Sequence, residues 1–305
     1  MNTLPIVNDI NESFFVQEER EGYFVSKDIK NIWAVELDLL IEFSKVCKKC
    51  GLRFFLDSGT LLGAVRHGGF IPWDDDIDVI MLRSDYDILT KQCASEFKQP
   101  YFLQTAHTDI GYYRPHAQLR NSNTTGILPN EKNRVKFNQG IFLDIFVLDG
   151  IPDTEEDIDK QLASQVEILE ILRKMNNNCD NLFRQAYWDI RTRFYCAKYG
   201  DSKSLYDKFE MLIKRDNSDY VDKIGFRRDK SKLCMLKREW FNSECFLDFE
   251  GFSFPVPYEF KKVLSVYYGN NYMTPVKAPT LHGEVFFDPF TPYTEYLKLN
   301  WHSIS

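Results

Sequence analysis

Apolar residues recur at helical spacing in residues 27–50, and this pattern predicts the first long helix of the chain. Its apolar face would consist of Ile29, Trp33, Leu37, Leu40 and Val46. Ser26 is a residue type that caps helix N-termini, and Gly51 is one that ends helices. The pattern therefore predicts an amphipathic helix with one buried face.

Short β-branched and aromatic runs alternate with further helical stretches after this helix. The predicted strands cover residues 53–57, 77–81, 101–106, 116–121 and 140–148. The predicted helices cover residues 60–66, 85–97 (capped by Ser84), 153–175, 181–199 and 203–214. A strand-like stretch over residues 240–254 leads to Pro257, which would begin a helix that ends at Gly269. This order predicts an α+β fold, in which helices flank a mixed sheet and a helical segment is inserted in the second half.

The composition is that of a globular protein. Of the 305 residues, 44% are apolar and 27% are charged, which excludes a disordered, collagen-like or coiled-coil chain. The net charge of −7 argues against a protein that mainly binds nucleic acid, since that function needs a concentrated basic surface. The first residues lack the basic and apolar regions of a secretory signal, and no run approaches the roughly 18 apolar residues of a membrane span. We therefore expect a cytoplasmic protein without an integral membrane segment.

The cysteines do not suggest a metal or redox centre. There are seven of them, irregularly spaced. Cys47 and Cys50 form a CxxC motif, but no second pair follows at zinc-finger spacing, and Cys47 continues the apolar helix face. Reduced, buried thiols are the favoured interpretation.

The densest chemical signal is the segment Pro72-Trp73-Asp74-Asp75-Asp76-Ile77-Asp78-Val79. Four carboxylates within five residues repel one another, and solvent or a cation has to offset that repulsion. If Asp76 begins a strand, Asp76 and Asp78 point to one face of the sheet and the intervening apolar residue packs on the other. Two carboxylates about 7 Å apart on one strand face can hold one or two Mg²⁺ ions, which bridge phosphate oxygens in phosphoryl transfer.

Three other interpretations of this acidic segment compete. An EF-hand loop is disfavoured, because Val79 stands where that loop needs glycine and Asp85 where it prefers glutamate. A solvated acidic turn is disfavoured, because the segment continues directly into the apolar run Ile77 to Met81. A glycosyltransferase Asp-x-Asp that holds a nucleotide-sugar stays open, since the motif alone does not exclude it.

A strand, a glycine turn and a helix start lie upstream, in residues 57–63. Gly59 would let the backbone approach a ligand, and the free N–H groups of a helix start attract phosphate. The hydroxyls of Ser58 and Thr60 can donate to phosphate oxygens. The polar residues that follow, which could meet a diphosphate or could simply be surface charge at a helix end, are Arg66 and His67.

Asp144 lies inside the apolar run Ile141 to Phe146. A carboxylate is expensive to bury in such a strand without compensation. Metal binding or proton transfer is therefore the favoured interpretation of Asp144, whereas Asp149 is interpreted as a turn residue at the end of the same strand.

Two nearly continuous strings, residues 59–67 (GTLLGAVRH) and 69–78 (GFIPWDDDID), resemble the signature of the LicD family and, more distantly, of the fukutin-type transferases. The wider pattern of a glycine turn, an Asp-x-Asp and a third Asp on a later strand resembles the polymerase-β-like nucleotidyltransferase fold. Weaker similarities extend the resemblance over roughly residues 35–285, although residues 160–240 match no family that we can name.

The resemblance implies a division of the chain. A nucleotidyltransferase-like catalytic core would occupy residues 24–152, followed by a helical insertion or subdomain over residues 153–239. Residues 240–290 would be the C-terminal part of the LicD-like domain. Residues 1–23 and 291–305 would be peripheral tails.

The resemblance also implies a reaction. A Mg²⁺-dependent enzyme, with Mn²⁺ as the alternative metal, would move a phospho-alcohol from a CDP-linked donor to a glycan hydroxyl and release CMP. Phosphocholine is the first choice of phospho-alcohol, and the acceptor would be a teichoic-acid, lipopolysaccharide or capsule precursor. The alternatives are transfer of ribitol or glycerol phosphate, a true nucleotidyltransferase that releases pyrophosphate, and an inactive binding domain. A peripheral contact with a membrane-linked acceptor stays open.

Site residues are carried over from the family by position. The metal and catalytic site would consist of Asp76, Asp78 and Asp144. The donor would be bound by Ser58, Gly59, Thr60, Arg66 and Arg120. Further candidates are His67, Trp73, Asp75 and His282. An aromatic cage for choline could come from Trp73, Tyr112 with Tyr113, or Tyr267 with Tyr268, and the sequence does not choose among them.

Overall fold

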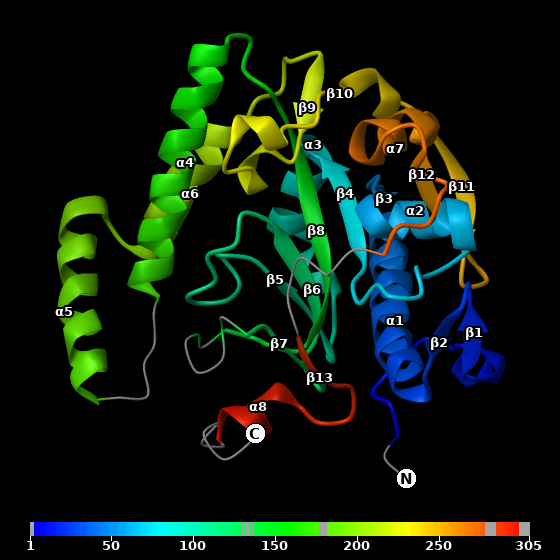
Figure 1. Cartoon of the computed structure of the whole chain (residues 1–305). Helices are drawn as coiled ribbons and strands as arrows, with labels where there is room; N and C mark the ends of the chain where they lie inside the picture. Colours follow the sequence, from blue (N-terminus) through cyan, green and yellow to red (C-terminus); the bar gives the residue numbers. More distant parts are fainter. Residues whose placement is uncertain are drawn as a thin grey trace.

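The long strand β8 (Ile141–Gly150) is the centre of the main sheet (Figure 1). The computed structural model describes residues 3–129, 131, 135, 137–176, 182–277 and 285–298. Within them, β8 pairs in parallel with β4 (Asp78–Leu82) and antiparallel with β6 (Ala117–Asn121) and β9 (Tyr220–Asp222). The outer strands are β3 (Phe55–Leu56) beside β4, β5 (Tyr101–Gln104) beside β6 and β10 (Leu236–Lys237) beside β9. Every residue of β8 is buried, so both faces of the strand are covered.

The remaining elements surround this sheet. Two-stranded ribbons are formed by β1 (Glu18–Arg20) with β2 (Tyr23–Val25), β7 (Thr125–Ile127) with β13 (Phe286–Asp288), and β11 (Glu244–Phe249) with β12 (Phe252–Pro257). The helices are α1 (Lys27–Cys50), α2 (Ser58–His67), α3 (Arg83–Ile88), α4 (Glu155–Met175), α5 (Leu182–Tyr199), α6 (Ser202–Ile213), α7 (Phe260–Tyr268) and α8 (Tyr293–Leu297). A mixed sheet with flanking helices confirms the predicted α+β class.

Helix α1 has the bounds and caps that its sequence predicts. Oγ of Ser26 accepts a hydrogen bond from the Ile29 amide at 3.3 Å, and Gly51 ends the helix with a φ of 68°, which favours glycine. The buried face packs against β8 and β6. The ring of Trp33 stacks on Phe70 in the loop after α2, with the centroids 4.5 Å apart.

The predicted helix over residues 85–97 is wrong in its start and its regularity. Helix α3 begins at Arg83, and Leu82 rather than Ser84 occupies the N-cap position. The guanidinium of Arg83 is buried against Asp149, with Nη2 2.5 Å from Oδ2, and this ion pair holds the first turn in place. A π-helical turn (Leu89–Cys93) and a 3-10 turn (Ala94–Glu96) then replace the expected α-helix. Asp149 is therefore a buried ion-pair partner and not merely a turn residue.

The predicted single strand over residues 240–254 is a hairpin. Strands β11 and β12 are joined by Glu250 and Gly251, whose φ angles are 53° and 82°. Two residues of positive φ make the tight turn that suits a twisted hairpin. Pro257 is the last residue of β12 and does not begin a helix, since α7 begins at Phe260.

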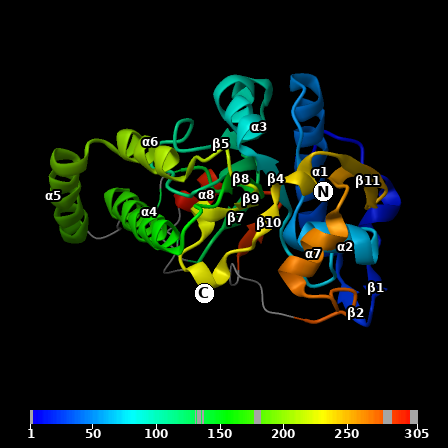
Figure 2. The same ribbon diagram turned by 90° about the horizontal axis from the view of Figure 1, so that it is seen from above.

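Helices α4, α5 and α6 flank the sheet on the side away from α1 (Figures 1 and 2). They share a hydrophobic cluster of their own, which includes Leu162, Leu172, Phe209 and Ile213. Strands β9 and β10 follow them in the chain and rejoin the main sheet. The division into domains at residues 153 and 239 stays a prediction, and the structure shows that this range also supplies sheet strands.

The sequence analysis also made predictions about the cysteines and about membrane-spanning helices. Cys47 and Cys50 are free thiols, the first buried and the second half-buried. Among the described helices, none combines the length and the apolar character needed to cross a membrane.

Candidate metal and phosphate site

Three neighbouring carboxylates meet in the loop between α2 and β4. Asp74, Asp75 and Asp76 each place one oxygen within 4.8 Å of the other two, and all three side chains are half-buried. The loop is fixed at Asp74, whose carbonyl accepts a hydrogen bond from the indole Nε1 of Trp33 at 3.0 Å. The strand predicted over residues 77–81 is β4, which begins at Asp78, so Asp76 lies in the loop and does not share a strand face with Asp78.

Asp78 and Asp144 lie directly opposite each other on the parallel strands β4 and β8. Side chains paired in this way share one face of the sheet. Asp144 is buried, and its Oδ1 accepts a hydrogen bond from Nε2 of Gln118 at 2.6 Å. Nε2 of His116 lies 3.2 Å from the same oxygen. The structure thus places Asp144 beside Asp78 with a polar support that the sequence did not indicate.

Glu36 of α1 is a further carboxylate at this cluster, and the sequence analysis missed it. Its side chain is only 1% exposed, and its Oε2 has no hydrogen-bond partner among the residues that the structure describes. Burial raises the pKa of Glu36 well above its ordinary value, and the negative charges of Asp75 and Asp74 raise it further. The helical pattern could have revealed Glu36, because it lies one turn after Trp33 on the buried face of α1.

The acidic groups repel one another strongly when no cation is bound. Burial raises the pKa of Asp74 to about 6, and the charge of Asp75 contributes. Burial followed by the charges of Asp78 and Asp74 raises the pKa of Asp76 well above its ordinary value. Carboxylate oxygens are the ligands that Mg²⁺ prefers, and Oε2 of Glu36, which no described residue contacts by a hydrogen bond, adds a further ligand atom. The donor set therefore fits a divalent cation.

The start of helix α2 lies beside this cluster. Asp57 is the N-cap residue, and its side chain makes no capping hydrogen bond. Ser58 has a φ of 47°, a left-handed conformation that is uncommon for a residue other than glycine. The hydroxyl of Thr60 accepts a hydrogen bond from the amide of Asp78 at 2.8 Å, which ties the helix start to the strand. Thr60 is buried, and its hydroxyl fixes the backbone of Asp78 through this hydrogen bond.

Gly59 allows the close approach of helix α2 to Asp74. A Cβ atom at residue 59 would overlap Oδ2 of Asp74. A Cβ atom at Gly63, by contrast, would overlap the backbone oxygen of Gly69. The first clash is with a movable carboxylate and the second is with backbone.

This difference predicts distinct effects of alanine at the two glycines. We expect Gly59→Ala to displace the Asp74 carboxylate and lower activity at least about tenfold, with little change in thermal unfolding, because a side chain can rotate away. We expect the matched control Gly63→Ala to lower the free energy of unfolding by about 1–3 kcal/mol. Calorimetry and turnover of both variants check this. Equal losses of stability would contradict it.

Lys223 is the second residue that the sequence analysis missed. It follows β9, and its Nζ lies 2.5 Å from Oδ2 of Asp57 and 2.8 Å from Oγ of Ser58. Burial opposes the charge of Lys223, but Asp57 and Asp78 raise its pKa above the ordinary value. The phenol of Tyr267 donates to the other oxygen of Asp57 at 3.0 Å. A buried cation thus lies against the start of α2, and it interacts electrostatically with Asp78.

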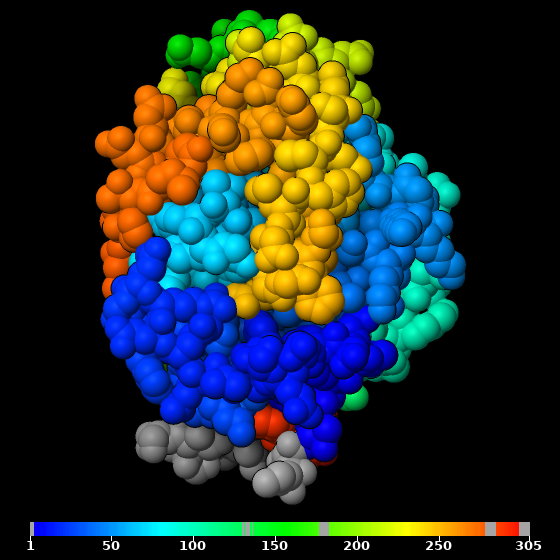
Figure 3. Space-filling model, turned by 90° about the vertical axis from the view of Figure 1, so that its right-hand side faces the viewer, coloured from blue at the N-terminus to red at the C-terminus, as the bar shows by residue number. Residues whose placement is uncertain are grey.

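Residues 66, 67 and 73 lie at the far end of α2. Nη1 of Arg66 donates to the carbonyl of Tyr272 at 3.0 Å. His67 lies 3.2 Å from Oε2 of Glu21, and its ring makes an edge contact with Trp73. The outer surface of α2 is framed by the N-terminal segment, by the hairpin β11–β12 and by the segment that contains α7 (Figure 3).

Arg120 lies inside the protein and does not reach the surface. It is 0% exposed, and its guanidinium donates to the side-chain oxygens of Gln104 and Gln118 and to the carbonyl of Gly140, each at 2.6 Å. Gln118 in turn donates to Asp144, so Arg120 is linked to that carboxylate, and its burial does not support the predicted contact with the donor. His282 lies outside the described residues.

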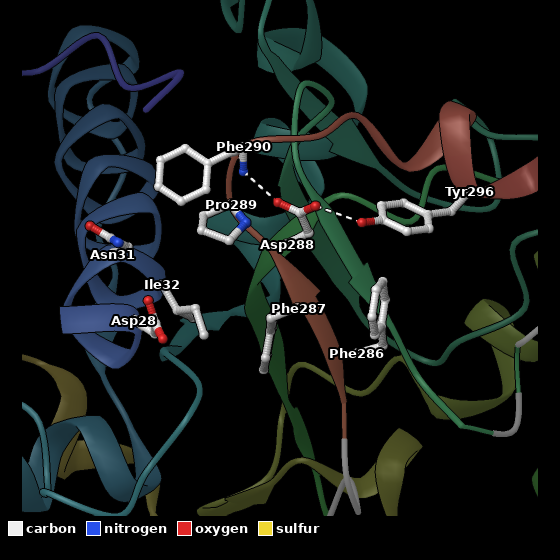
Figure 4. Close-up of a pocket in the computed structure, with 9 residues that line it drawn as sticks. All are labelled: Asp28, Asn31, Ile32, Phe286, Phe287, Asp288, Pro289, Phe290 and Tyr296. Atoms are coloured by element: carbon white, nitrogen blue, oxygen red, sulfur yellow. Dashed lines mark hydrogen bonds between the residues drawn. The ribbon is translucent and has the colours of Figure 1, made fainter. Parts of the chain in front are cut away.

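A cavity of about 400 Å³ lies elsewhere, between α1 and β13 (Figure 4). It is lined by Asp28, Asn31, Ile32, Phe286, Phe287, Asp288, Pro289, Phe290 and Tyr296. Asp288 accepts hydrogen bonds from the Phe290 amide at 2.8 Å and from the Tyr296 phenol at 2.6 Å, which fixes the wall of the cavity. Of the predicted site residues that the structure describes, none lines this cavity.

Comparison with known proteins shows a sequence similarity in the part of the chain that contains this site. Residues 51–148 match the profile described as the nucleotidyltransferase domain of LicD, FKTN and FKRP. The chain is 27% identical over 239 residues to the lipopolysaccharide cholinephosphotransferase LicD of Haemophilus influenzae, which covers 77% of this chain and 87% of that protein. It is 53% identical over 34 residues to human ribitol 5-phosphate transferase FKRP, which covers 11% of this chain and 7% of that protein. The matched region contains the α2 start and the carboxylates of β4 and β8, and the chain therefore contains a LicD-family domain over residues 51–148.

Proposed function

We propose that this protein transfers a phospho-alcohol from a CDP-linked donor to a hydroxyl of a glycan, with release of CMP. The observation that carries the proposal is the position of Asp74, Asp76, Asp78 and Asp144 beside the start of α2, within the LicD-family domain. The relatives named as cholinephosphotransferase and ribitol 5-phosphate transferase support this class of reaction. We also propose that the sheet core is nucleotidyltransferase-like, as the family profile is described.

We propose that Mg²⁺ would be held by Asp76 and Asp78, with Asp74, Asp75, Asp144 and Glu36 as further oxygen donors around them. When bound, the metal would neutralise charge on the donor diphosphate and on the leaving group. The amides at the start of α2 are suited to phosphate oxygens. Asp144 would take the proton of the acceptor hydroxyl, and His116 Nε2, 3.2 Å from Oδ1, offers the next position for that proton.

One observation favours a second candidate for the alcohol that the transferred phosphate carries, besides choline. The ammonium of Lys223 lies 4.6 Å from the ring centre of Phe146 and 5.2 Å from that of Tyr267. These aromatic faces already hold a cation, and a choline placed beside them would be repelled by it. Tyr112 is buried and donates to the His116 carbonyl at 2.9 Å, so it does not form a cage at the surface. An uncharged alditol, such as ribitol or glycerol, is therefore the second candidate.

The test is a panel of CDP-alcohols. The full chain with Mg²⁺ is incubated with CDP-choline, CDP-ribitol or CDP-glycerol and a glycan acceptor, and CMP is measured. We expect CMP from one donor, and we expect that donor to raise the unfolding temperature only when Mg²⁺ is present. Incubation with CTP and a phospho-alcohol separates the nucleotidyltransferase alternative, which would release pyrophosphate. Donor binding without CMP release would contradict the proposal and would favour the alternative of an inactive binding domain.

A further inference from the structure

Helix α5 (Leu182–Tyr199) lies at the outer edge of the molecule (Figures 1 and 2). It contacts α4, and the buried ring of Tyr195 joins the hydrophobic cluster of the helical segment. Most of the described side chains of α5 are exposed, so the helix uses a narrow face to attach to the protein. The opposite face is directed to solvent.

That outer face carries a continuous apolar stripe. The exposed fractions of its residues are 89% for Phe183, 53% for Tyr187, 68% for Ile190 and 65% for Phe194. At about 100° per residue, these four positions fall within about 60° of arc, so they form one line along the helix. Large apolar side chains scattered singly on a surface are ordinary, but four in line on one helix indicate a surface with a binding function.

Basic residues border the stripe on both sides. Helix α5 contains four basic side chains (Arg184, Arg191, Arg193 and Lys198) and one acidic side chain (Asp189), although the whole chain has a net charge of −7. On the helical projection, Arg193 falls on one side of the stripe and Arg184, Arg191 and Lys198 on the other. Asp189 falls on the far side of the helix from the stripe. An exposed apolar stripe with basic side chains beside it is the pattern of a helix that lies in a membrane interface.

We propose that α5 docks this protein on a membrane surface that contains anionic lipid, with the stripe in the interface and the basic residues among the headgroups. Charge complementarity selects this partner over a second copy of the chain. Two α5 helices facing each other would bring eight basic side chains together with only two acidic ones, and the cations would repel. Anionic headgroups would neutralise the same cations.

Flotation of the full chain with vesicles tests the proposal. Vesicles of phosphatidylcholine with about 30% phosphatidylglycerol are compared with vesicles of phosphatidylcholine alone. We expect binding to the anionic vesicles that falls at least about tenfold in Phe183→Ser/Phe194→Ser and severalfold in Arg193→Gln/Lys198→Gln. The matched control is Phe246→Ser, which removes an apolar side chain that is 57% exposed on β11, away from the stripe. It should bind as the wild type does.

The contrary results are distinct. No binding of the wild type to anionic vesicles would overturn the proposal, as would unchanged binding of Phe183→Ser/Phe194→Ser. The wild type could instead self-associate without binding vesicles. If Phe183→Ser/Phe194→Ser abolished that self-association, the stripe would be a contact surface for a second copy of the chain. The unfolding temperature of each variant shows that the fold is retained, since all the changed side chains are exposed. The test does not depend on the proposed enzymatic reaction.

Discussion

Replacing Asp76 with asparagine is expected to lower phospho-alcohol transfer at least about a hundredfold, because a metal ligand and its charge are lost together. The same change should raise the unfolding temperature of the metal-free protein. Burial and the charges of Asp78 and Asp74 make an ionised Asp76 costly, and asparagine removes that cost. The expected gain is about 2 °C or more, for roughly 1 kcal/mol. CMP release and calorimetry in EDTA measure the two effects.

Asp153→Asn is the matched control for this experiment. Asp153 is exposed and precedes α4, outside the cluster. It should change neither the transfer rate nor the unfolding temperature by a measurable amount. Addition of Mg²⁺ should stabilise the wild type and this control more than it stabilises Asp76→Asn. Wild-type turnover in Asp76→Asn would contradict the proposed site.

Lys223→Met is expected to destabilise the fold by about 3 kcal/mol or more, since it leaves Asp57 buried without its cation. It should also reduce transfer, because Lys223 is the buried cation beside the helix start and Asp78. The double variant Asp57→Asn/Lys223→Met removes both charges and should recover most of the stability without recovering activity. Denaturant unfolding and turnover of the single and double variants separate the structural contribution from the catalytic one.

Lys230→Met is the matched control for Lys223→Met, because it removes an ammonium group at the surface. Its ammonium forms surface ion pairs with Glu155 and Asp159, and the side chain is 49% exposed. Such pairs contribute about 0–1 kcal/mol, so the change should be nearly neutral. If Lys223→Met unfolded like the wild type, the ion pair with Asp57 would contribute little to the stability of the fold.

The local structure around the site was largely predictable from the sequence. The apolar periodicity and caps of α1, the glycine that ends it and the short helix after Gly59 all come from neighbours along the chain. Local signals were insufficient where a distant partner decides the conformation. Helix α3 begins at Arg83 because of Asp149, which lies on a strand more than sixty residues later in the chain. The hairpin turn at Glu250 and Gly251 was missed even though glycine marks it.

The residues of the candidate site likewise divide into those that the local sequence identifies and those that only distant contacts bring to the site. Asp74, Asp75, Asp76 and Asp78 are adjacent in the chain, and Asp144 was recognisable as a charge within an apolar strand. Glu36 is an ordinary polar position in a helix until the packing of α1 buries it against the carboxylates. Arg120 was a plausible phosphate ligand until the sheet enclosed it among Gln104, Gln118 and Gly140.

By itself, the sequence determined the acidic segment, the helix start before it and the α+β class, because these depend on residue types at short spacing. Tertiary structure alone decided which charges share the site. Lys223 lies outside residues 51–148, which the family profile matches, and it lies against Asp57 because β9 pairs with β8. The apolar positions of α5 are spaced like those of a core helix, and only their exposure shows that they lie on the surface. Burial and proximity depend on the whole fold, and they set both the charge state of the site and the use of that helix face.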